Sequence, residues 1–260
     1  MNQIMATVLS NGPVMEGANM LWLRSPELAR EAKPGQFLMV RCDDGADPLL
    51  RRALSILHVA RPFPGQNVPG CAILYNYRGS GTERLRRLRE GDTVDVIGPL
   101  GKGFTVRRTS KNLLLIGVSW GVSPLIALAE QQVALGRSVT LVMGAATGAQ
   151  LYPSELFPPE VELVVATEDA SAGQKGSVTD LAAEYWFWAD EVYASGPISM
   201  YAGLSSATAR LWPRKAVQVL AEMPMACGVG ACYACTIITR RGPKLSCRDG
   251  PRFYLSDLLL

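Results

Sequence analysis

Short apolar segments separated by turn residues make up the first part of the chain. These segments lie at residues 36–42, 53–59, 72–77 and 93–97, and Gly, Pro and Asp residues are concentrated between them. Short strands that recur at regular spacing are typical of an antiparallel β-barrel or sandwich. We therefore predict an antiparallel all-β domain over residues 1–105.

The pattern then changes to continuous apolar segments that alternate with helix-like ones. Strands are predicted at 113–117, 139–143, 161–166 and 191–195, and helices at 124–135, 179–188 and 197–211. This alternation is typical of a parallel sheet covered by helices on both faces. It predicts an α/β domain over residues 106–215. One further strand, at 216–220, leads into a small cysteine-rich domain over residues 216–260.

Composition and charge narrow the class of protein. The chain is 48% hydrophobic and 19% charged, which is ordinary for a globular protein. Its longest apolar run, 113–118, is far shorter than the roughly 18 residues that span a bilayer. The N-terminus lacks the features of a signal peptide. The net charge of +3 is small, and the arginine-rich segment 84–89 has leucines three positions apart, which predicts a helix with a solvated basic face. We expect a cytoplasmic protein that binds neither membranes nor nucleic acid.

The chain contains one histidine, His58, directly after an apolar segment. A single histidine argues strongly against Ser-His-Asp catalysis and against metal sites with several histidines. We predict that His58 is a strand residue rather than a catalyst. The scarcity of histidine favours an enzyme in which a cofactor carries the chemistry.

The strongest chemical signal is the cysteine spacing near the C-terminus. Cys227, Cys232 and Cys235 follow the pattern C-x4-C-x2-C, and Cys247 comes after eleven further residues. This is the spacing of plant-type [2Fe–2S] ligands. Gly228 and Gly230 allow the loop to turn tightly and to direct N–H groups at the sulfurs.

A structural zinc site is the main alternative. Zinc sites are typically built from two C-x2-C pairs, and the sequence contains one. Cys42 and Cys71 are isolated in strand-like segments and are predicted to be buried side chains.

Two elements of the first domain suggest a flavin. Arg52 and Ser55 are predicted to share one strand face through a local twist, so that a cation binds pyrophosphate and a hydroxyl bonds the isoalloxazine edge. The turn Gly79-Ser80-Gly81-Thr82 is predicted to open the arginine-rich helix, where free N–H groups favour phosphate.

Taken together, these motifs resemble a known family. The segments that carry the resemblance are Pro34–Phe37, Arg52–Ser55, Gly79–Thr82, Gly98–Gly101 and the terminal cysteine segment through Phe253. They are similar to the electron transfer subunits of NAD-dependent dihydroorotate dehydrogenases, which are ferredoxin–NADP reductase-like flavoproteins. The resemblance covers essentially the whole chain. It implies an FAD-binding barrel, a Rossmann-like nicotinamide-dinucleotide domain and a C-terminal [2Fe–2S] domain.

The resemblance also implies a partner and an electron path. The partner would be a catalytic subunit that holds FMN and oxidises dihydroorotate in pyrimidine (UMP) biosynthesis, in a heterotetramer of two subunits of each kind. Electrons would pass from FMN through [2Fe–2S] and FAD to NAD. The implied FAD-lining residues are Arg52, Ala53, Leu54, Ser55, Tyr75, Asn76, Gly81 and Thr82. The implied dinucleotide residues are Gly117, Gly121, Ser195 and Gly196.

The sequence departs from the family pattern in the nucleotide domain. Where the family has Gly-Gly-Gly-x-Gly, this chain has Gly117-Val118-Ser119-Trp120-Gly121, and a Cys-Gly-Pro element is replaced by Ser195-Gly196-Pro197. We expect the added side chains to crowd the approach of a dinucleotide.

Two alternative functions remain at this point. The chain could serve another ferredoxin-reductase-like complex, such as a bifurcating transhydrogenase, a sulfide dehydrogenase or a hydrogenase-like assembly. It could also be a non-catalytic assembly subunit that has lost NAD binding.

Overall fold

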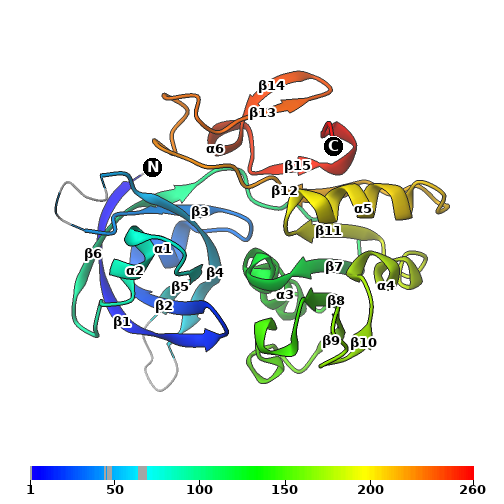
Figure 1. Cartoon of the computed structure of the whole chain (residues 1–260), viewed down its shortest axis with the longest axis horizontal. Helices are drawn as coiled ribbons and strands as arrows, with labels where there is room; N and C mark the ends of the chain where they lie inside the picture. The colour runs from blue at the N-terminus through cyan, green and yellow to red at the C-terminus, as the bar shows by residue number, and fades with distance from the viewer. Residues whose placement is uncertain (1, 44, 46–48, 64–68) are drawn as a thin grey trace.

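The computed structural model describes residues 2–43, 45, 49–63 and 69–260. It contains an N-terminal β-barrel, a parallel-sheet domain and a small C-terminal lobe that lies above both (Figure 1). Among the described residues, no helix is long and apolar enough to cross a membrane.

Six antiparallel strands close the barrel in the order β1-β2-β5-β4-β3-β6, which confirms the predicted all-β domain. Side chains that alternate along the strands fill its interior, including the fully buried Leu21, Ile56 and Ile73. Two short helices, α1 (Pro26–Glu31) and α2 (Ser80–Leu85), accompany the strands. The strand bounds are β1 Asn2–Met15, β2 Ala18–Arg24, β3 Phe37–Val40, β4 Arg52–Pro62, β5 Pro69–Asn76 and β6 Thr93–Leu100.

Helix α2 is shorter than the arginine-rich pattern predicts. It ends at Leu85, and the N–H groups of Arg87 and Leu88 donate to carbonyls three residues earlier, which continues the chain as tight turns. Leu85 is fully buried and Leu88 packs against the barrel core. The leucines therefore face inward as predicted, although the regular helix does not continue.

A seven-stranded sheet, in the order β10-β9-β8-β7-β11-β12-β15, forms the second domain. Its strands are parallel except β15, which pairs antiparallel with β12. β12 and β15 come from the C-terminal segment, so residues on both sides of the predicted boundary at 215 contribute to one sheet. The strand bounds are β7 Asn112–Val118, β8 Ser138–Ala145, β9 Val161–Thr167, β10 Gln174–Lys175, β11 Glu191–Ser195, β12 Val217–Leu220 and β15 Arg252–Tyr254.

Helices cover both faces of this sheet, as the alternating pattern predicts. Alternate residues of β7 point to opposite faces, so Leu115 packs in the cluster that contains α3 and Leu114 in the one that contains α4 and α5. The cluster on the α3 side also contains barrel residues, among them Trp22 and Leu57, so α3 lies between sheet and barrel. The helix bounds are α3 Ser123–Ala134, α4 Val178–Glu184 and α5 Ile198–Thr208, with single 3-10 turns η1 Ser119–Val122, η2 Gly148–Gln150 and η3 Ser154–Leu156.

Helices α4 and α5 end earlier than predicted. After α4 the chain turns so that Trp186 is buried, with its indole N–H donating to the carbonyl of Pro213 at 2.9 Å. This tertiary contact overrides the helical pattern, which by itself continues to residue 188. The C-terminal lobe contains the hairpin β13 Thr236–Thr239 and β14 Gly242–Leu245, the helical turn α6 Ser246–Asp249 and η4 Leu255–Asp257.

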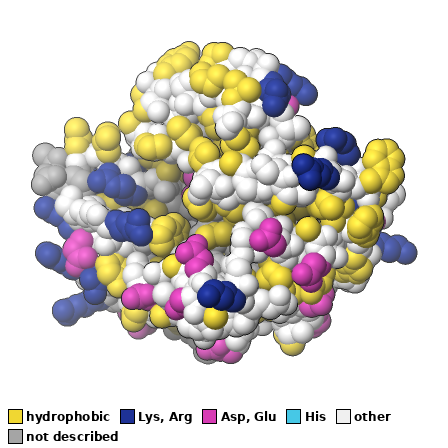
Figure 2. Space-filling model, turned by 45° about the vertical axis from the view of Figure 1, so that its right-hand side comes forward, with side chains coloured by type: hydrophobic (Ala, Val, Ile, Leu, Met, Phe, Trp, Pro, Cys, Tyr) yellow, Lys and Arg dark blue, Asp and Glu magenta, His cyan; other side chains and the backbone are white. Residues whose placement is uncertain are grey.

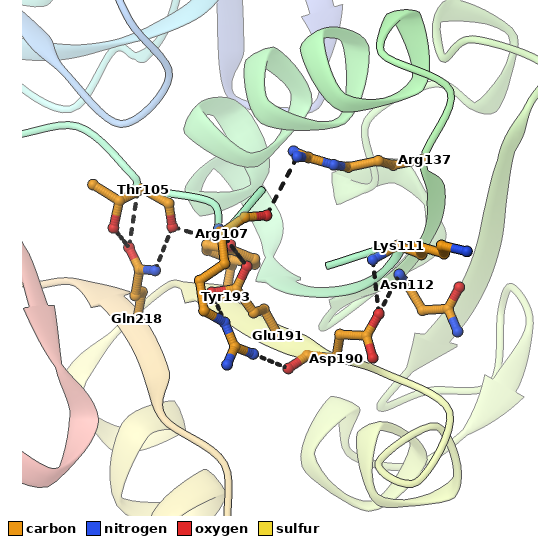
Figure 3. Close-up of polar contacts among 9 residues, drawn as sticks. All are labelled: Thr105, Arg107, Lys111, Asn112, Arg137, Asp190, Glu191, Tyr193 and Gln218. Atoms are coloured by element: carbon orange, nitrogen blue, oxygen red, sulfur yellow. Dashed lines mark hydrogen bonds and ion pairs between the residues drawn. The ribbon is translucent and has the colours of Figure 1, made fainter. Parts of the chain in front are cut away.

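A polar network fixes the linker between barrel and sheet (Figure 3). Arg107 donates to the Glu191 carboxylate from its backbone N–H and its guanidinium, at 3.0 and 3.1 Å. Gln218 exchanges hydrogen bonds with the backbone of Thr105, and Asp190 accepts two backbone N–H groups from the start of β7. These bonds anchor the linker to β11 and β12 of the sheet.

His58 forms a second connection between the two domains. It lies in β4, as predicted, and is 2% exposed. Its Nδ1 lies 2.9 Å from a carboxylate oxygen of Glu130 in α3, and its ring stacks on Trp22 with centroids 5.1 Å apart. The single histidine therefore has a structural role at the interface of barrel and helix.

We predict that replacing His58 with alanine will lower the free energy of unfolding by about 2–4 kcal/mol, because it opens a cavity and removes the 2.9 Å contact with the Glu130 carboxylate. Urea unfolding followed by fluorescence measures this. Leu135→Ala, at a residue that is 65% exposed, serves as the control and should change stability by less than about 0.5 kcal/mol. Equal effects of the two substitutions would contradict the proposed role.

Candidate functional site

The loop after β12 and the start of α6 bring the four predicted cysteine ligands together. Cys235 Sγ lies 3.3 Å from Cys247 Sγ, although a hairpin separates them in sequence. Cys227 and Cys232 form a second pair linked by hydrogen bonds, and the charge of Cys227 acts on Cys247. The thiols are therefore arranged as two neighbouring pairs.

Two neighbouring thiol pairs match the ligand arrangement of a binuclear cluster. Among the described residues, no three His, Cys, Asp or Glu side chains converge on one metal position. A structural zinc ion needs four ligands around one centre. A [2Fe–2S] cluster distributes four thiolates over two irons, so two pairs suffice. The two thiol pairs therefore supply the donor set that such a cluster needs.

Backbone geometry in the loop depends on glycine. Gly228 and Gly230 have φ values of 72° and 85°, which other residues rarely adopt. A Cβ atom added to Gly228 would lie 2.4 Å from Cγ of Met39 in β3, so the loop lies directly against the barrel. The two glycines therefore allow the tight turn of the loop, as the sequence predicts. Gly228 also lets the loop pack closely against β3.

Backbone N–H groups prepare the first thiol for metal binding. Burial opposes ionisation of Cys227, but hydrogen bonds from the N–H groups of Val229, Cys232 and Ala231 outweigh it and lower the pKa of this thiol to about 6. The pKa of Cys247 is raised to about 12, first by burial and then by the adjacent Cys235. Metal binding requires thiolates, so binding at Cys247 must release the proton of this thiol.

One small hydrophobic core joins the thiols to the barrel. Cys235 and Cys247 are buried together with Phe37, Met39 and Leu100, which come from β3 and β6. Ala53 of β4 packs against the same core. The buried thiol pair and strand β4, which carries the predicted flavin residues, thus pack in the same hydrophobic core.

A pocket of about 140 Å³ opens beside this core. Ala53 and Ser55 line it from the barrel, and Glu222, Met223 and Met225 line it from the segment that precedes the cysteines. The Ser55 hydroxyl donates to the Glu222 carboxylate across the pocket. The surrounding protein atoms exclude water from the Glu222 carboxyl, and this desolvation raises its pKa. The hydrogen bond from Ser55 opposes the shift.

Arg52 also contacts the first turn of α2. A Cβ atom added to Gly81 would lie 3.1 Å from Nε and Nη2 of Arg52, so the guanidinium rests on the bare backbone of the turn. Gly79 precedes the helix and Thr82 lies in its first turn, with its hydroxyl donating to the Gly79 carbonyl. The structure therefore joins the cation and the glycine turn that were predicted to bind phosphate.

The prediction that Arg52 and Ser55 share a strand face is wrong. The β3–β4 ladder pairs Val40, Met39, Leu38 and Phe37 in unbroken register with residues 52 to 55. Successive side chains therefore alternate, and no local twist brings positions 52 and 55 to one side. Ser55 lines the pocket, whereas Leu54 packs against the barrel interior.

Tyr75 also differs from its predicted position. Its ring is 2% exposed inside the barrel, and its hydroxyl donates to Asn11 at 2.8 Å. Burial raises the pKa of this phenol to about 12. The Tyr75 side chain is thus part of the core, and the adjacent Asn76 is partly exposed at the end of β5.

The predicted dinucleotide residues gather at the carboxyl ends of β7 and β11, where the strand order reverses. Such reversals are the usual ligand crevices of open α/β sheets. A Cβ atom on Gly121 would lie 3.0 Å from Cα of Gly196 and from the Ser195 carbonyl, so the two predicted elements touch. Gly117 instead permits close packing of its strand on Val122.

A pocket of about 460 Å³ lies beside these residues. It extends along the ends of β7, β8 and β9, and α4 and α5 also contribute to its wall. Polar groups such as Glu168, Lys175 and Ser199 line it. The pocket is large enough for part of a dinucleotide, and the sequence patterns did not identify its polar residues.

The altered turn crowds this crevice less than the sequence predicts. Val118 lines the pocket, but Ser119 is buried and Trp120 turns toward the barrel. The guanidinium carbon of Arg78, which follows β5, lies 4.7 Å from the centre of the Trp120 ring. Of the side chains at positions 118 to 120, only Val118 borders the pocket.

Sequence reasoning missed Glu222 and Arg78 as site residues. Each contacts a residue that is distant in the chain, Ser55 in one case and Trp120 in the other. Glu222 stands at the head of the cysteine segment, and this adjacency was the only signal in the sequence.

Known structures with the same fold support this description. A flavin-based NADH-dependent reduced ferredoxin–NADP oxidoreductase superposes with a TM-score of 0.84 and 28% identity, covering 99% of this chain and 91% of that one. Phthalate dioxygenase reductase superposes with a TM-score of 0.65 and 17% identity, covering 92% and 87% of the two chains. The fold and the four-thiol loop define the chain as an electron-transfer oxidoreductase subunit of the ferredoxin reductase type.

Sequence comparisons define the family. Residues 222–259 match the iron–sulfur cluster binding domain of dihydroorotate dehydrogenase B. The electron transfer subunit of dihydroorotate dehydrogenase B (NAD(+)) from Geobacillus sp. (strain WCH70) is 37% identical over 265 residues, which is 100% of both chains. The corresponding subunit of Bacillus caldolyticus is 38% identical and covers 98% of this chain and 97% of its own. The chain belongs to this family of electron transfer subunits.

We predict that Gly228→Ala will sharply reduce iron and inorganic sulfide per chain, because the new Cβ atom collides with Met39 and the backbone has a positive φ. Chemical analysis and visible absorption measure the loss. Gly12→Ala is the matched control, since nothing lies within 4 Å of its added Cβ atom. Normal iron content in the Gly228 variant would mean that the loop can shift without losing its ligands.

Proposed function

We propose that the chain passes electrons from the FMN of a dihydroorotate-oxidising partner subunit, through a [2Fe–2S] cluster and FAD, to NAD+. The observation that carries the proposal is the shared core in which Cys235 and Cys247 pack against β3 and β4 of the barrel. Family membership supplies the reaction, because the curated relatives are named as electron transfer subunits of an NAD(+)-dependent enzyme.

Each cofactor has residues suited to hold it. Cys227, Cys232, Cys235 and Cys247 would hold the irons, with N–H groups of the loop directed at the first sulfur. Arg52 and the Gly81 turn would hold the FAD pyrophosphate, and Ala53 and Ser55 would border its isoalloxazine ring. The bound flavin supplies the conversion between single-electron and hydride transfer.

The outer face of the cysteine loop suits the partner. Hydrophobic side chains gather on the upper lobe, which the C-terminal segment forms (Figure 2). Val229 and Tyr233 are 41% and 65% exposed beside the ligands, and Ile238 on the hairpin is 55% exposed. We propose that the FMN subunit covers this face in a heterotetramer of two subunits of each kind, in the pathway to UMP.

A second candidate function rests on the ferredoxin–NADP oxidoreductase, whose structure superposes over nearly the whole chain. It would place the chain in an electron-bifurcating complex. Dihydroorotate-dependent reduction of NAD+ by the assembled complex separates the two functions. NADH-dependent reduction of the flavin in the isolated chain separates both from a non-catalytic assembly subunit.

We predict that the complex with the FMN subunit will reduce NAD+ with dihydroorotate and will contain about two irons and two sulfides per copy of this chain. Cys235→Ala should remove the cluster and abolish NAD+ reduction, while dihydroorotate still reduces an artificial dye at the FMN subunit. Cys42→Ala, a buried cysteine of the barrel, is the control and should retain both activities. Zinc in anaerobically purified protein, or NAD+ reduction without the cluster, would refute the proposal.

We predict that Arg52→Ala will weaken FAD binding by about 1.5–3 kcal/mol, because a charge-assisted bond to phosphate is lost. Fluorescence titration of the flavin-free protein with FAD measures this. Arg210→Ala, at an exposed residue after α5, should bind FAD normally. Unchanged FAD affinity in the Arg52 variant would place the pyrophosphate elsewhere.

A further inference from the structure

Arg78 and Trp120 form a contact that joins the barrel to the nucleotide domain. Arg78 lies between β5 and the Gly79–Thr82 turn, and Trp120 lies in η1, directly after β7. The guanidinium carbon is 4.7 Å from the ring centroid, which is within cation–π range. The contact thus connects the proposed FAD phosphate turn to the turn that departs from the family's glycine pattern.

Arg78 is exposed, and its charge has no ion-pair partner among the described residues. The nearby Arg84 and Arg86 are instead paired, with Asp43 and Glu83. An unpaired guanidinium held in place by an aromatic ring is well suited to bind a phosphate.

The turn beside Trp120 has two further features of an anion site. It leads into α3, a helix of 12 residues whose N-terminal dipole favours negative charge. Ser119 and Ser123 are 8% and 2% exposed, and neither hydroxyl has a hydrogen-bond partner among the described residues. Buried hydroxyls are usually bonded, so these two indicate a ligand that the chain itself does not supply.

The position of the turn at residues 118–121 indicates which phosphate group Arg78 would contact. Val118, two residues before Trp120, lines the 460 Å³ pocket, and Gly121 contacts Gly196 at the proposed nicotinamide end. In the proposed binding mode, a dinucleotide extends from the pocket toward the flavin and crosses this turn with its central pyrophosphate. The FAD pyrophosphate already has its own cation, because Arg52 rests on Gly81.

We infer that Arg78 binds the pyrophosphate of the nicotinamide dinucleotide and that Trp120 positions it for this role. This inference rests on the proposed NAD-linked function. The family's glycine turn lets phosphates approach bare backbone. In this chain Arg78, which follows barrel strand β5, lies over the bulkier turn. Its charged side chain takes the place of the missing glycines. Trp120 acts through Arg78 and is a positioning residue.

The test is a double-mutant cycle on binding, with ADP-ribose as the probe. ADP-ribose carries the pyrophosphate but no nicotinamide, so calorimetry on the FAD-loaded, oxidised protein measures binding without catalysis. Arg78→Ala should weaken binding about tenfold, as expected for one charge-assisted contact. Trp120→Leu should weaken it about two- to fivefold, the range of an exposed cation–π contact. The double variant should bind no more weakly than Arg78→Ala alone.

Controls separate this inference from the proposed function. Arg210→Ala should bind ADP-ribose normally, and both Arg78 and Trp120 variants should retain full FAD. If the wild-type protein binds neither ADP-ribose nor NADH, the NAD assignment fails and this inference with it. If the wild type binds but Arg78→Ala binds equally well or loses FAD instead, only the inference is overturned. Additive losses in the double variant would refute the positioning role of Trp120.

Discussion

The close packing of the cysteine loop on strand β3 is the constraint on which the rest of the site depends. Gly228 meets Met39 where no Cβ atom can fit, and Cys235 and Cys247 are buried against Phe37 and Leu100. Because protein interiors are close-packed, this core cannot open without losing many contacts at once. The thiols are therefore fixed relative to the strand that carries Ala53 and Ser55, which is what a short electron path between cluster and flavin requires.

The orientation of the sheet is held by different forces. Helix α3 lies between sheet and barrel in one hydrophobic cluster, and the linker is bonded to β11 and β12 through Glu191 and Gln218. His58 and Glu130 add a polar contact between β4 and α3. These contacts place the carboxyl ends of β7 and β11 near the barrel, and the proposed nicotinamide site depends on that placement.

In the proposed binding mode, the altered nucleotide turn keeps its task although its motif has changed. Side chains in place of glycines would crowd a phosphate if they all pointed into the crevice. Ser119 is instead buried and Trp120 contacts Arg78 of the barrel. In the proposed binding mode, the positive charge of Arg78 offsets the loss of bare backbone.

The sequence by itself determined most elements of the fold and the candidate metal ligands. Strand and helix patterns are local properties of the chain, and C-x4-C-x2-C spacing limits which thiols can share a cluster. These signals predicted the barrel, the parallel sheet and the four cysteines as candidate ligands. Helix ends were predicted less well, because the burial of Trp186 is a tertiary effect.

Only the tertiary structure decided which side chains face one another. Register placed Tyr75 inside the barrel and put Arg52 and Ser55 on opposite sides of their strand. The partners Ser55 and Glu222 are 167 residues apart, and no periodicity relates them. Such pairs form because separate elements dock on a common core, and the free energy of that docking comes from contacts distributed over the whole molecule.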